Sequence, residues 1–225
     1  MIAGALLSMI LGATLISATP FVASGCAQVA IITARASTEL PGEGIIGTVA
    51  GAIASQSSQT VSRACVDYPA LLFPYASSSA AGTVALSQQL TAQANNCPNQ
   101  KIVLLGYSQG AHIIGDVLGG GGGGTLGTKT PTISTAIGDR VTAFIQMGDP
   151  RHVTSEPYFV GTSTNNGLFP RGSDQTLTRY VSKGQSYCDS GDTFCDNGLN
   201  TLVHLAYVTI YGGEATNFVL TKIGG

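Results

Sequence analysis

Ser108 is the residue with the clearest capacity for chemistry. It is the middle residue of the segment from Gly106 to Gly110, GYSQG, which has a G-x-S-x-G pattern. A chain with 30 glycines in 225 residues can contain this pattern by chance, but here it separates an apolar segment, Lys101 to Leu105, from a helix-like one. A nucleophile elbow occupies such a junction, because its sharp turn exposes the serine hydroxyl and glycines allow strand and helix to approach. The pattern therefore predicts a nucleophilic serine.

A serine hydroxyl needs a base to accept its proton, and the chain contains three histidines. His204 follows the last predicted strand and precedes the final helical segment, which is where the chain order serine, acid, histidine places the base. His112 stands four residues after Ser108 and is expected to pack within the same helix. His152, at a strand end, remains an alternative. We expect His204 to be the base.

Two aspartates fit the position of the acid that orients this base. Asp149 follows the predicted strand from Val141 to Met147, and Asp192 lies in a later loop between two cysteines. The later position favours Asp192, since a disulfide across that loop would hold the carboxylate that has to orient the imidazole. For Asp149 the favoured interpretation is structural, either pairing with Arg151 or capping a turn. The residues alone leave both aspartates open.

Two N–H donors are expected to stabilise the oxyanion that forms when a serine attacks a carbonyl. One is the backbone N–H of Gln109, which directly follows the nucleophile. The other should come from the loop after an early strand, residues 34–39, where Ser37 is the candidate through its N–H and its hydroxyl. The alternative is an ordinary turn serine stabilised by Glu39 or Arg35.

The five cysteines suggest two disulfides and one remaining thiol in an oxidising compartment. Cys188 and Cys195 are seven residues apart and can close a small loop. Cys26 and Cys97 each precede a predicted strand, so neighbouring strands would bring them together. Cys65 is then left over, and we expect it to be a buried thiol that packs as a small apolar group.

Residues 1–23 are predicted to form a secretory signal peptide. They contain no charged side chain, are apolar from Ile2 to Ile16, and continue with small residues and Pro20. A retained membrane anchor is the alternative, but the apolar run is shorter than the roughly 20 residues that span a bilayer. We expect residues 24–225 to form a single catalytic domain of a secreted, extracellular protein.

The composition excludes several classes of protein. Charged residues make up 10% of the chain and hydrophobic residues 44%, with a net charge of -2, so the chain can bury a core and is not disordered. Ten scattered Lys and Arg residues provide no surface for nucleic acid. Three dispersed histidines form no ligand cluster, so no metal and no cofactor are expected. The low charge favours a monomer without stable membrane association.

Strand-like and helix-like segments alternate after residue 24, which indicates an α/β three-layer sandwich with a mostly parallel central sheet. The predicted strands are Gln28 to Thr33, Cys65 to Tyr68, Lys101 to Leu105, Val141 to Met147 and Thr176 to Ser182. The predicted helices are Gly44 to Arg63, Ser78 to Asn95, Gln109 to Leu118 and a segment from Leu205 or Tyr207, with a second stretch from Glu214 to Ile223. Gly119 to Gly124 is expected to be a flexible surface insertion.

Several separated segments resemble the secreted serine esterases that comprise cutinases and acetylxylan esterases, carbohydrate esterase family five. These segments are Cys26 with the following strand into Ala34 to Glu39, Tyr68 to Ala70, Asn96 to Pro98, Gly106 to Gly110, Cys188 to Cys195 and His204 to Tyr207. The resemblance implies a small lidless α/β-hydrolase that needs no cofactor. It assigns the nucleophile to Ser108, the acid to Asp192 and the base to His204.

The same resemblance implies oxyanion contacts at Ser37 and Gln109 and the disulfides Cys26–Cys97 and Cys188–Cys195. Met147 to Arg151 and Pro157-Tyr158 look more like acetylxylan esterases, whereas Arg35 to Glu39 and His204 to Tyr207 look more like cutinases. The unpaired Cys65 and the six-glycine run depart from the family pattern.

The substrate implied by this resemblance is a polysaccharide or polyester of the plant cell wall. Acetyl groups of xylan are favoured, and the longer esters of cutin are the alternative. Tyr107 and Tyr158 are candidates for contacting a polysaccharide, and Leu71 to Phe73 and Leu168 to Pro170 for contacting a longer acyl chain. A hypothesis of another class is a non-catalytic carbohydrate-binding or surface protein on the same fold.

Overall fold

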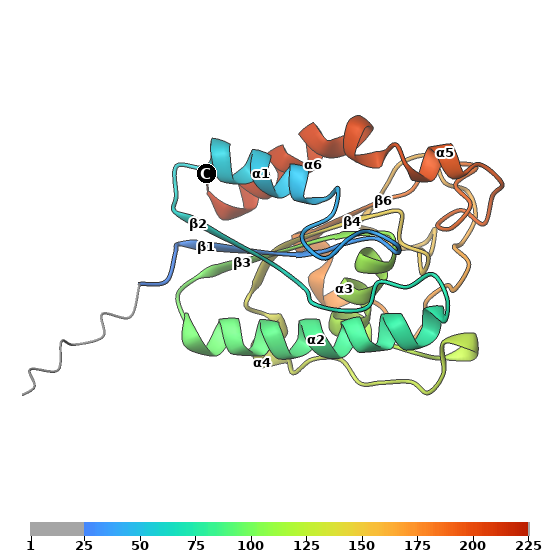
Figure 1. Cartoon of the computed structure of the whole chain (residues 1–225), viewed down its shortest axis with the longest axis horizontal. Helices are drawn as coiled ribbons and strands as arrows, with labels where there is room; N and C mark the ends of the chain where they lie inside the picture. The colour runs from blue at the N-terminus through green and yellow to red at the C-terminus, as the bar shows by residue number, and fades with distance from the viewer. Residues whose placement is uncertain (1–24, 225) are drawn as a thin grey trace, which may run out of the picture.

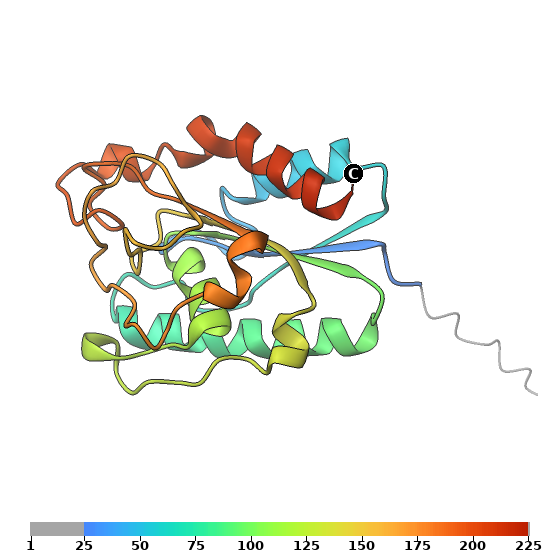
Figure 2. The same cartoon turned by 180° about the vertical axis from the view of Figure 1, so that it is seen from behind.

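The structure of the protein, a computed structural model, describes residues 25–224 (Figures 1 and 2). The predicted signal peptide, residues 1–23, lies outside the described residues. Within the described part of the chain, no helix is long and apolar enough to cross a membrane.

A central sheet of parallel strands forms the middle layer, in the order β2-β1-β3-β4-β6-β5. The strands are β1 (Val29–Ala34), β2 (Val61–Cys65), β3 (Lys101–Tyr107), β4 (Val141–Met147), β5 (Phe159–Val160) and β6 (Gly184–Tyr187). The helices are α1 (Gly47–Gln56), α2 (Tyr75–Asn96), α3 (Gln109–Gly119), α4 (Thr135–Gly138), α5 (Thr201–His204) and α6 (Tyr207–Ile223). Helices α1 and α6 cover one face, and α2, α3 and α4 the other (Figure 1). The predicted three-layer α/β architecture is confirmed.

Strand β3 shows why the sheet is covered on both faces. Successive side chains of a strand point to opposite sides, and all of β3 after Lys101 is buried. Ile102 and Leu104 pack into the cluster that contains Leu86 and Leu90 of α2. Val103 and Leu105 pack into the opposite cluster, which α1 and α6 complete. A continuous apolar run is therefore the expected pattern of this central strand.

The largest errors of the sequence prediction lie around β2. The predicted helix from Gly44 to Arg63 is wrong beyond Gln56, and the predicted strand from Cys65 to Tyr68 starts where the observed strand ends. Residues 55–60 comprise three serines, two glutamines and one threonine, and serine side chains compete for backbone hydrogen bonds, which favours turns over helix interiors. The three central residues of β2 are exposed at the edge of the sheet, so their sequence lacks the apolar alternation of a half-buried strand.

Two later segments also differ from the prediction. The predicted strand from Thr176 to Ser182 is wrong: Thr178–Lys183 forms a 3₁₀ helix, and the strand β6 follows it. This strand consists of Gly, Gln, Ser and Tyr, and pairing with β4 and β5 rather than an apolar pattern makes it a strand. The C-terminal segments predicted from Tyr207 and Glu214 form one continuous helix, α6.

The glycine run is partly interior. Gly119, Gly120 and Gly121 are buried, so the expected flexible surface insertion is wrong for this half of the run. The side-chain amide of Gln175 donates hydrogen bonds to the carbonyls of Gly120, Gly121 and Gly122. A Cβ atom on Gly119 would lie 2.6 Å from the Gln175 carbonyl oxygen. The backbone of this half of the glycine run lies so close to Gln175 that larger residues would not fit.

Two disulfides are present, Cys26–Cys97 and Cys188–Cys195, as the resemblance implies. The first joins the segments that lead into the neighbouring strands β1 and β3. Cys65 is unpaired at the end of β2 and half-buried, so it is more accessible than the expected core thiol.

The turn between β3 and α3 depends on two glycines. A Cβ atom on Gly110 would lie 1.9 Å from the carbonyl oxygen of Ala34 in β1, and one on Gly106 would lie 2.5 Å from the carbonyl oxygen of Gly110. Backbone atoms cannot move aside as side chains can. The first turn of α3 is therefore in contact with β1 only because both positions lack side chains.

We expect the substitution Gly110→Ala to destabilise the fold by about 1 to 3 kcal/mol or more, because it overpacks this contact with backbone. Gly213→Ala is the matched control, since Gly213 lies in α6 and a methyl group added there would meet open space, so alanine should raise stability by about 0.5–1 kcal/mol. Urea unfolding monitored by circular dichroism measures both. Equal stability of the two variants would contradict the proposed role of the contact.

Candidate active site

Ser108 occupies the turn that these glycines create. Its φ of 53° and ψ of -117° lie outside the helical and extended regions, a costly conformation for a residue with a side chain. Its N–H donates to the Met147 carbonyl (2.7 Å), and its carbonyl accepts the N–H of His112 (3.0 Å), the start of α3. The backbone is thus held by β4 on one side and by α3 on the other.

A cleft of about 290 Å³ lies above this turn, and both Ser108 and His204 line it. His204 comes from the short helix α5, which with the loop that carries Asp192 lies at the carboxyl end of the sheet (Figure 1). Ligands of open α/β sheets bind at this end. The serine and the histidine form no hydrogen bond within the described structure, and such contacts are often looser before substrate binds.

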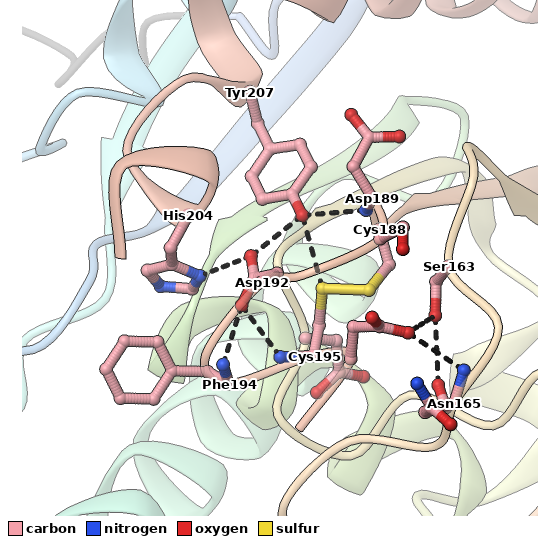
Figure 3. Close-up of a disulfide and its surroundings, with 12 residues drawn as sticks. Ser163, Asn165, Cys188, Asp189, Asp192, Phe194, Cys195, His204 and Tyr207 are labelled. Carbon is pink, nitrogen blue, oxygen red and sulfur yellow. Dashed lines mark hydrogen bonds and ion pairs between the residues drawn. A yellow bond between two sulfur atoms is a disulfide. The ribbon is translucent and has the colours of Figure 1, made fainter. Parts of the chain in front are cut away.

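Asp192 and His204 form a buried pair (Figure 3). The Asp192 Oδ2 atom lies 2.9 Å from Nδ1 of His204. An ionised carboxylate only accepts hydrogen bonds, so Nδ1 carries the proton and Nε2 is the nitrogen able to accept one. The ring of Phe194 packs on His204 with a centroid separation of 4.5 Å. This arrangement fixes both the tautomer and the orientation of the imidazole.

Asp192 is kept ionised by its surroundings. Its Oδ1 accepts the backbone N–H groups of Phe194 (2.6 Å) and Cys195 (2.9 Å), while Oδ2 also accepts the hydroxyl of Tyr207 (2.7 Å). Burial opposes ionisation, but the hydrogen bonds from His204, Cys195 and Tyr207 outweigh it and lower the pKa of Asp192. The carboxylate therefore remains charged at neutral pH.

The loop around Asp192 is held in several ways. The disulfide Cys188–Cys195 closes it (Figure 3), and the Asp196 carboxylate accepts the N–H groups of Gly191, Thr164 and Asn165. Although Asp196 lies in a loop, its side chain is almost fully buried. It ties the loop to residues 163–165, so the position of Asp192 depends on two segments far apart in sequence.

Ser37 also lines the cleft. Glu39 holds its loop by accepting the N–H groups of Ala36 (2.6 Å) and Ile45 (2.7 Å). The buried guanidinium of Arg35 donates to the carbonyls of Glu39 and Val66. Glu39 and Arg35 thus stabilise the turn, and that same turn sets Ser37 beside the cleft. Gln109, the first residue of α3, leaves its N–H outside the helical hydrogen bonds.

The other sequence candidates do not join this constellation. His112 is fully buried, and its ring nitrogens lie near Tyr75 and Asp116. His152 packs against Phe159 with a centroid separation of 4.6 Å. Asp149 accepts the N–H of Arg151 and caps a turn, which is one of the structural roles expected for it.

The two tyrosines expected beside the substrate differ in placement. Tyr107 lines the cleft, with its hydroxyl donating to the carbonyl of His204 and only 3% of its surface exposed. Tyr158 does not line the cleft: it is buried in the core, where its ring meets the edge of Phe144. The expected contact of Tyr158 with substrate is therefore wrong, because burial of its large apolar ring in the core is favourable.

Sequence reasoning missed three residues of the site, namely Tyr207, Phe194 and Tyr75. Tyr207 belongs to the segment His204 to Tyr207 that carried the resemblance, yet its hydrogen bond to Asp192 depends on the start of α6. Phe194 lies inside the disulfide loop beside Asp192. Tyr75 begins α2 and lines the cleft from a segment 33 residues before Ser108, and no local pattern indicates this contact.

Four charged side chains form a buried ionic cluster close to the residues that line the cleft. Asp116 of α3 accepts hydrogen bonds from Arg151 (2.8 Å) and Arg171 (2.8 Å), and Arg171 also reaches Asp149 (3.3 Å). All four side chains are almost completely buried. Burial opposes ionisation of Asp116, but the hydrogen bond from His112 and the charges of the two guanidinium groups hold its pKa well below the usual value.

The parallel sheet, the strained serine at the β3–α3 turn and the buried His–Asp pair define an α/β-hydrolase site. Residues 25–223 match the family described as Cutinase. The chain belongs to the cutinase family and is a carboxylic ester hydrolase of that family.

Its relatives carry both cutinase and acetylxylan esterase names. It is 36% identical to Cutinase 11 of Verticillium dahliae, over 88% of this chain and 70% of that one. It is 35% identical to Acetylxylan esterase 2 of Talaromyces purpureogenus, over 88% of each chain. The solved catalytic core domain of acetyl xylan esterase from Trichoderma reesei superposes with a TM-score of 0.82 at 33% identity, over 88% of this chain and 99% of that one.

We expect Asp116→Asn to lower the free energy of unfolding by about 3–5 kcal/mol near neutral pH, because it leaves buried positive charge uncompensated. The pKa of Asp116 is lower in the folded protein than the usual value. Its stabilising contribution is therefore complete above about pH 5 and is lost as pH falls through the folded-state pKa. The difference in unfolding free energy between wild type and Asp116→Asn should consequently become smaller at acidic pH. Urea unfolding across a pH series measures this.

Asp139→Asn is the matched control for that experiment. Asp139 pairs with Arg179 on the surface, where an ion pair contributes little. A comparable loss of unfolding free energy in the two variants would contradict the role assigned to Asp116. So would a difference in unfolding free energy between wild type and Asp116→Asn that does not depend on pH.

Proposed function

We propose that the protein hydrolyses esters through an acyl-enzyme on Ser108, with His204 as the base and Asp192 as the acid that orients it. The observation that carries this proposal is the buried hydrogen bond between Asp192 and Nδ1 of His204, beside a cleft that Ser108 and His204 share. A hydroxyl at the strained turn, a base with a free Nε2 and a fixed carboxylate are the elements of nucleophilic acyl transfer.

In the first half-reaction, Ser108 Oγ attacks the ester carbonyl carbon while Nε2 of His204 accepts the hydroxyl proton. The carbonyl oxygen becomes negative, and the N–H of Gln109 together with Ser37 stabilises it. The C–O bond to the alcohol then breaks, and His204 returns its proton to the leaving oxygen. Asp192 stabilises the imidazolium that exists between these two transfers.

The second half-reaction repeats these roles with water. Nε2 of His204 accepts a proton from the water as its oxygen attacks the acyl carbon, and the same oxyanion donors act again. Collapse of the intermediate returns the proton to Ser108 and releases the carboxylic acid. No step in this scheme requires a metal or an organic cofactor.

Acetyl groups on a polysaccharide such as xylan are the substrate that we propose. Similarity supports this choice, since the match to the Talaromyces acetylxylan esterase covers 88% of both chains. Two solved acetylxylan esterase structures superpose with a TM-score of 0.83, compared with 0.70 for a cutinase-like protein from Cryptococcus.

Cutin or another polyester with longer acyl groups is the second candidate. The observation in its favour is the apolar rim of the cleft, where Leu72 is 55% exposed and Leu205 65% exposed, with the neighbouring Phe73 at 90%. Apolar side chains at a cleft mouth favour contact with an apolar substrate surface.

We further propose that the enzyme acts outside the cell as a monomer on such a polymer. The two disulfides support an oxidising compartment, and the apolar segment before Cys26 supports export.

Two variants test the catalytic assignment on p-nitrophenyl acetate. Ser108→Ala should abolish turnover, and Asp192→Asn should lower kcat by about 10⁴-fold because the amide stabilises the wrong histidine tautomer. Asp189→Asn is the control, because the Asp189 carboxylate lies in the same loop but accepts hydrogen bonds from Thr162 and Tyr211 rather than from His204. Activity of Ser108→Ala equal to that of wild type would sink the assignment.

The substrate is tested with acetylated xylan and with a p-nitrophenyl ester series from acetate to palmitate. We expect acetate release from xylan and a kcat/KM that falls steeply as the acyl chain lengthens, which is the profile of an enzyme specific for acetyl esters. A maximum at butyrate or beyond, with release of acids from cutin, would instead support the cutinase candidate. Absence of all turnover and of labelling by a serine-directed phosphonate would favour the non-catalytic binding protein.

A further inference from the structure

Tyr75 reaches the cleft from the first turn of α2. Its hydroxyl lies 2.8 Å from Nδ1 of His112, and its ring stacks on Phe169 with a centroid separation of 5.3 Å and an interplanar angle of 27°. Tyr75 and Phe169 both line the cleft that contains Ser108. The ring is therefore held at its hydroxyl end and across its face.

His112 is anchored in turn by the ionic cluster. Its Nε2 lies 3.0 Å from Oδ2 of Asp116, one helical turn further along α3. The other carboxylate oxygen already receives both Arg151 and Arg171. These two positive charges balance the carboxylates of the cluster without a charged imidazole, so we assign His112 as neutral.

The direction of each hydrogen bond follows from this charge state. The carboxylate of Asp116 only accepts, so Nε2 of His112 carries the proton and Nδ1 accepts one. The hydroxyl proton of Tyr75 therefore points to His112 and is not offered to a ligand. Towards the cleft, Tyr75 acts through its ring rather than as a hydrogen-bond donor.

The size of the cleft indicates which part of the ester this ring meets. A cleft of about 290 Å³ cannot enclose a polymer chain, so the alcohol side of a polymeric ester must extend into solvent. The enclosed part of the substrate is then the acyl group attached to the carbonyl. An aromatic ring that cannot rotate away sets a fixed limit on that group.

We propose that Tyr75 is a specificity-determining residue that limits the length of the acyl group accepted beside Ser108, and that His112 is its positioning residue. The inference rests on the proposed esterase function and adds the residue that selects short acyl groups. Asp116 links the selection to the buried cluster, because it fixes the proton on His112 that keeps the hydroxyl of Tyr75 bound.

The test is the ratio of kcat/KM for p-nitrophenyl hexanoate to that for the acetate. Tyr75→Ala should raise this ratio by about 10-fold or more, since each methylene accommodated in an apolar pocket changes kcat/KM by roughly 10-fold. Tyr75→Phe retains the ring but frees it from His112, so we expect a smaller rise in the ratio, carried by KM for hexanoate. Tyr211→Phe is the matched control, because the Tyr211 hydroxyl bonds to Asp189 and not to the cleft.

The outcomes separate this inference from the function on which it rests. An unchanged ratio in folded Tyr75→Ala, checked by near-UV circular dichroism, overturns the inference while wild-type turnover upholds the esterase. If Tyr75→Ala does not fold, Tyr75→Phe is the deciding variant. A hexanoate-to-acetate ratio of kcat/KM equal to that of Tyr211→Phe then overturns the inference. Loss of wild-type activity on every ester defeats the proposed function, and the inference with it.

Discussion

The close approach of α3 to β1 is the constraint on which the rest of the site depends. Because Gly110 lies against the carbonyl of Ala34, the helix can begin directly at the end of β3, and Ser108 is left in a turn with a positive φ. The same contact places the N–H of Gln109 and the loop that carries Ser37 on one side of the cleft. A larger side chain at position 110 would push α3 away from β1, so the proposed nucleophile and the proposed oxyanion donors depend on one steric condition.

His204 and Asp192, the proposed base and acid, are positioned by a different kind of constraint. Neither lies in a long regular element: His204 ends the short helix α5, and Asp192 lies in a loop. Their geometry is instead maintained by a disulfide, by the carboxylate of Asp196 and by the hydroxyl of Tyr207 at the start of α6. Rigid backbone thus holds one half of the site, and covalent and polar cross-links hold the other.

The sequence was informative where local chemistry decides the structure. The run Lys101 to Leu105 and the glycines around Ser108 express local rules, and the alternation of strand-like and helix-like segments predicted the layered sheet architecture. It failed at β2 and β6, whose polar residues become strands only by pairing with neighbours. It also failed for Tyr158 and Tyr75, because whether a tyrosine enters the core or the cleft depends on segments distant in the chain.

The buried cluster around Asp116 shows how a group remote from the nucleophile can matter to the site. Exposed charges would be screened and free to move, but these side chains are buried and each has a defined partner, so the cluster has few alternative arrangements. The free energy needed to desolvate these charges offsets most of their attraction, so the cluster adds little net stability. What it does provide is a fixed direction for the His112 proton, and through that proton a fixed ring at the cleft. A hydrophobic replacement of similar volume could match the packing, but it would no longer fix the proton on Nε2 of His112, so Nδ1 would no longer be held as the acceptor of the Tyr75 hydroxyl.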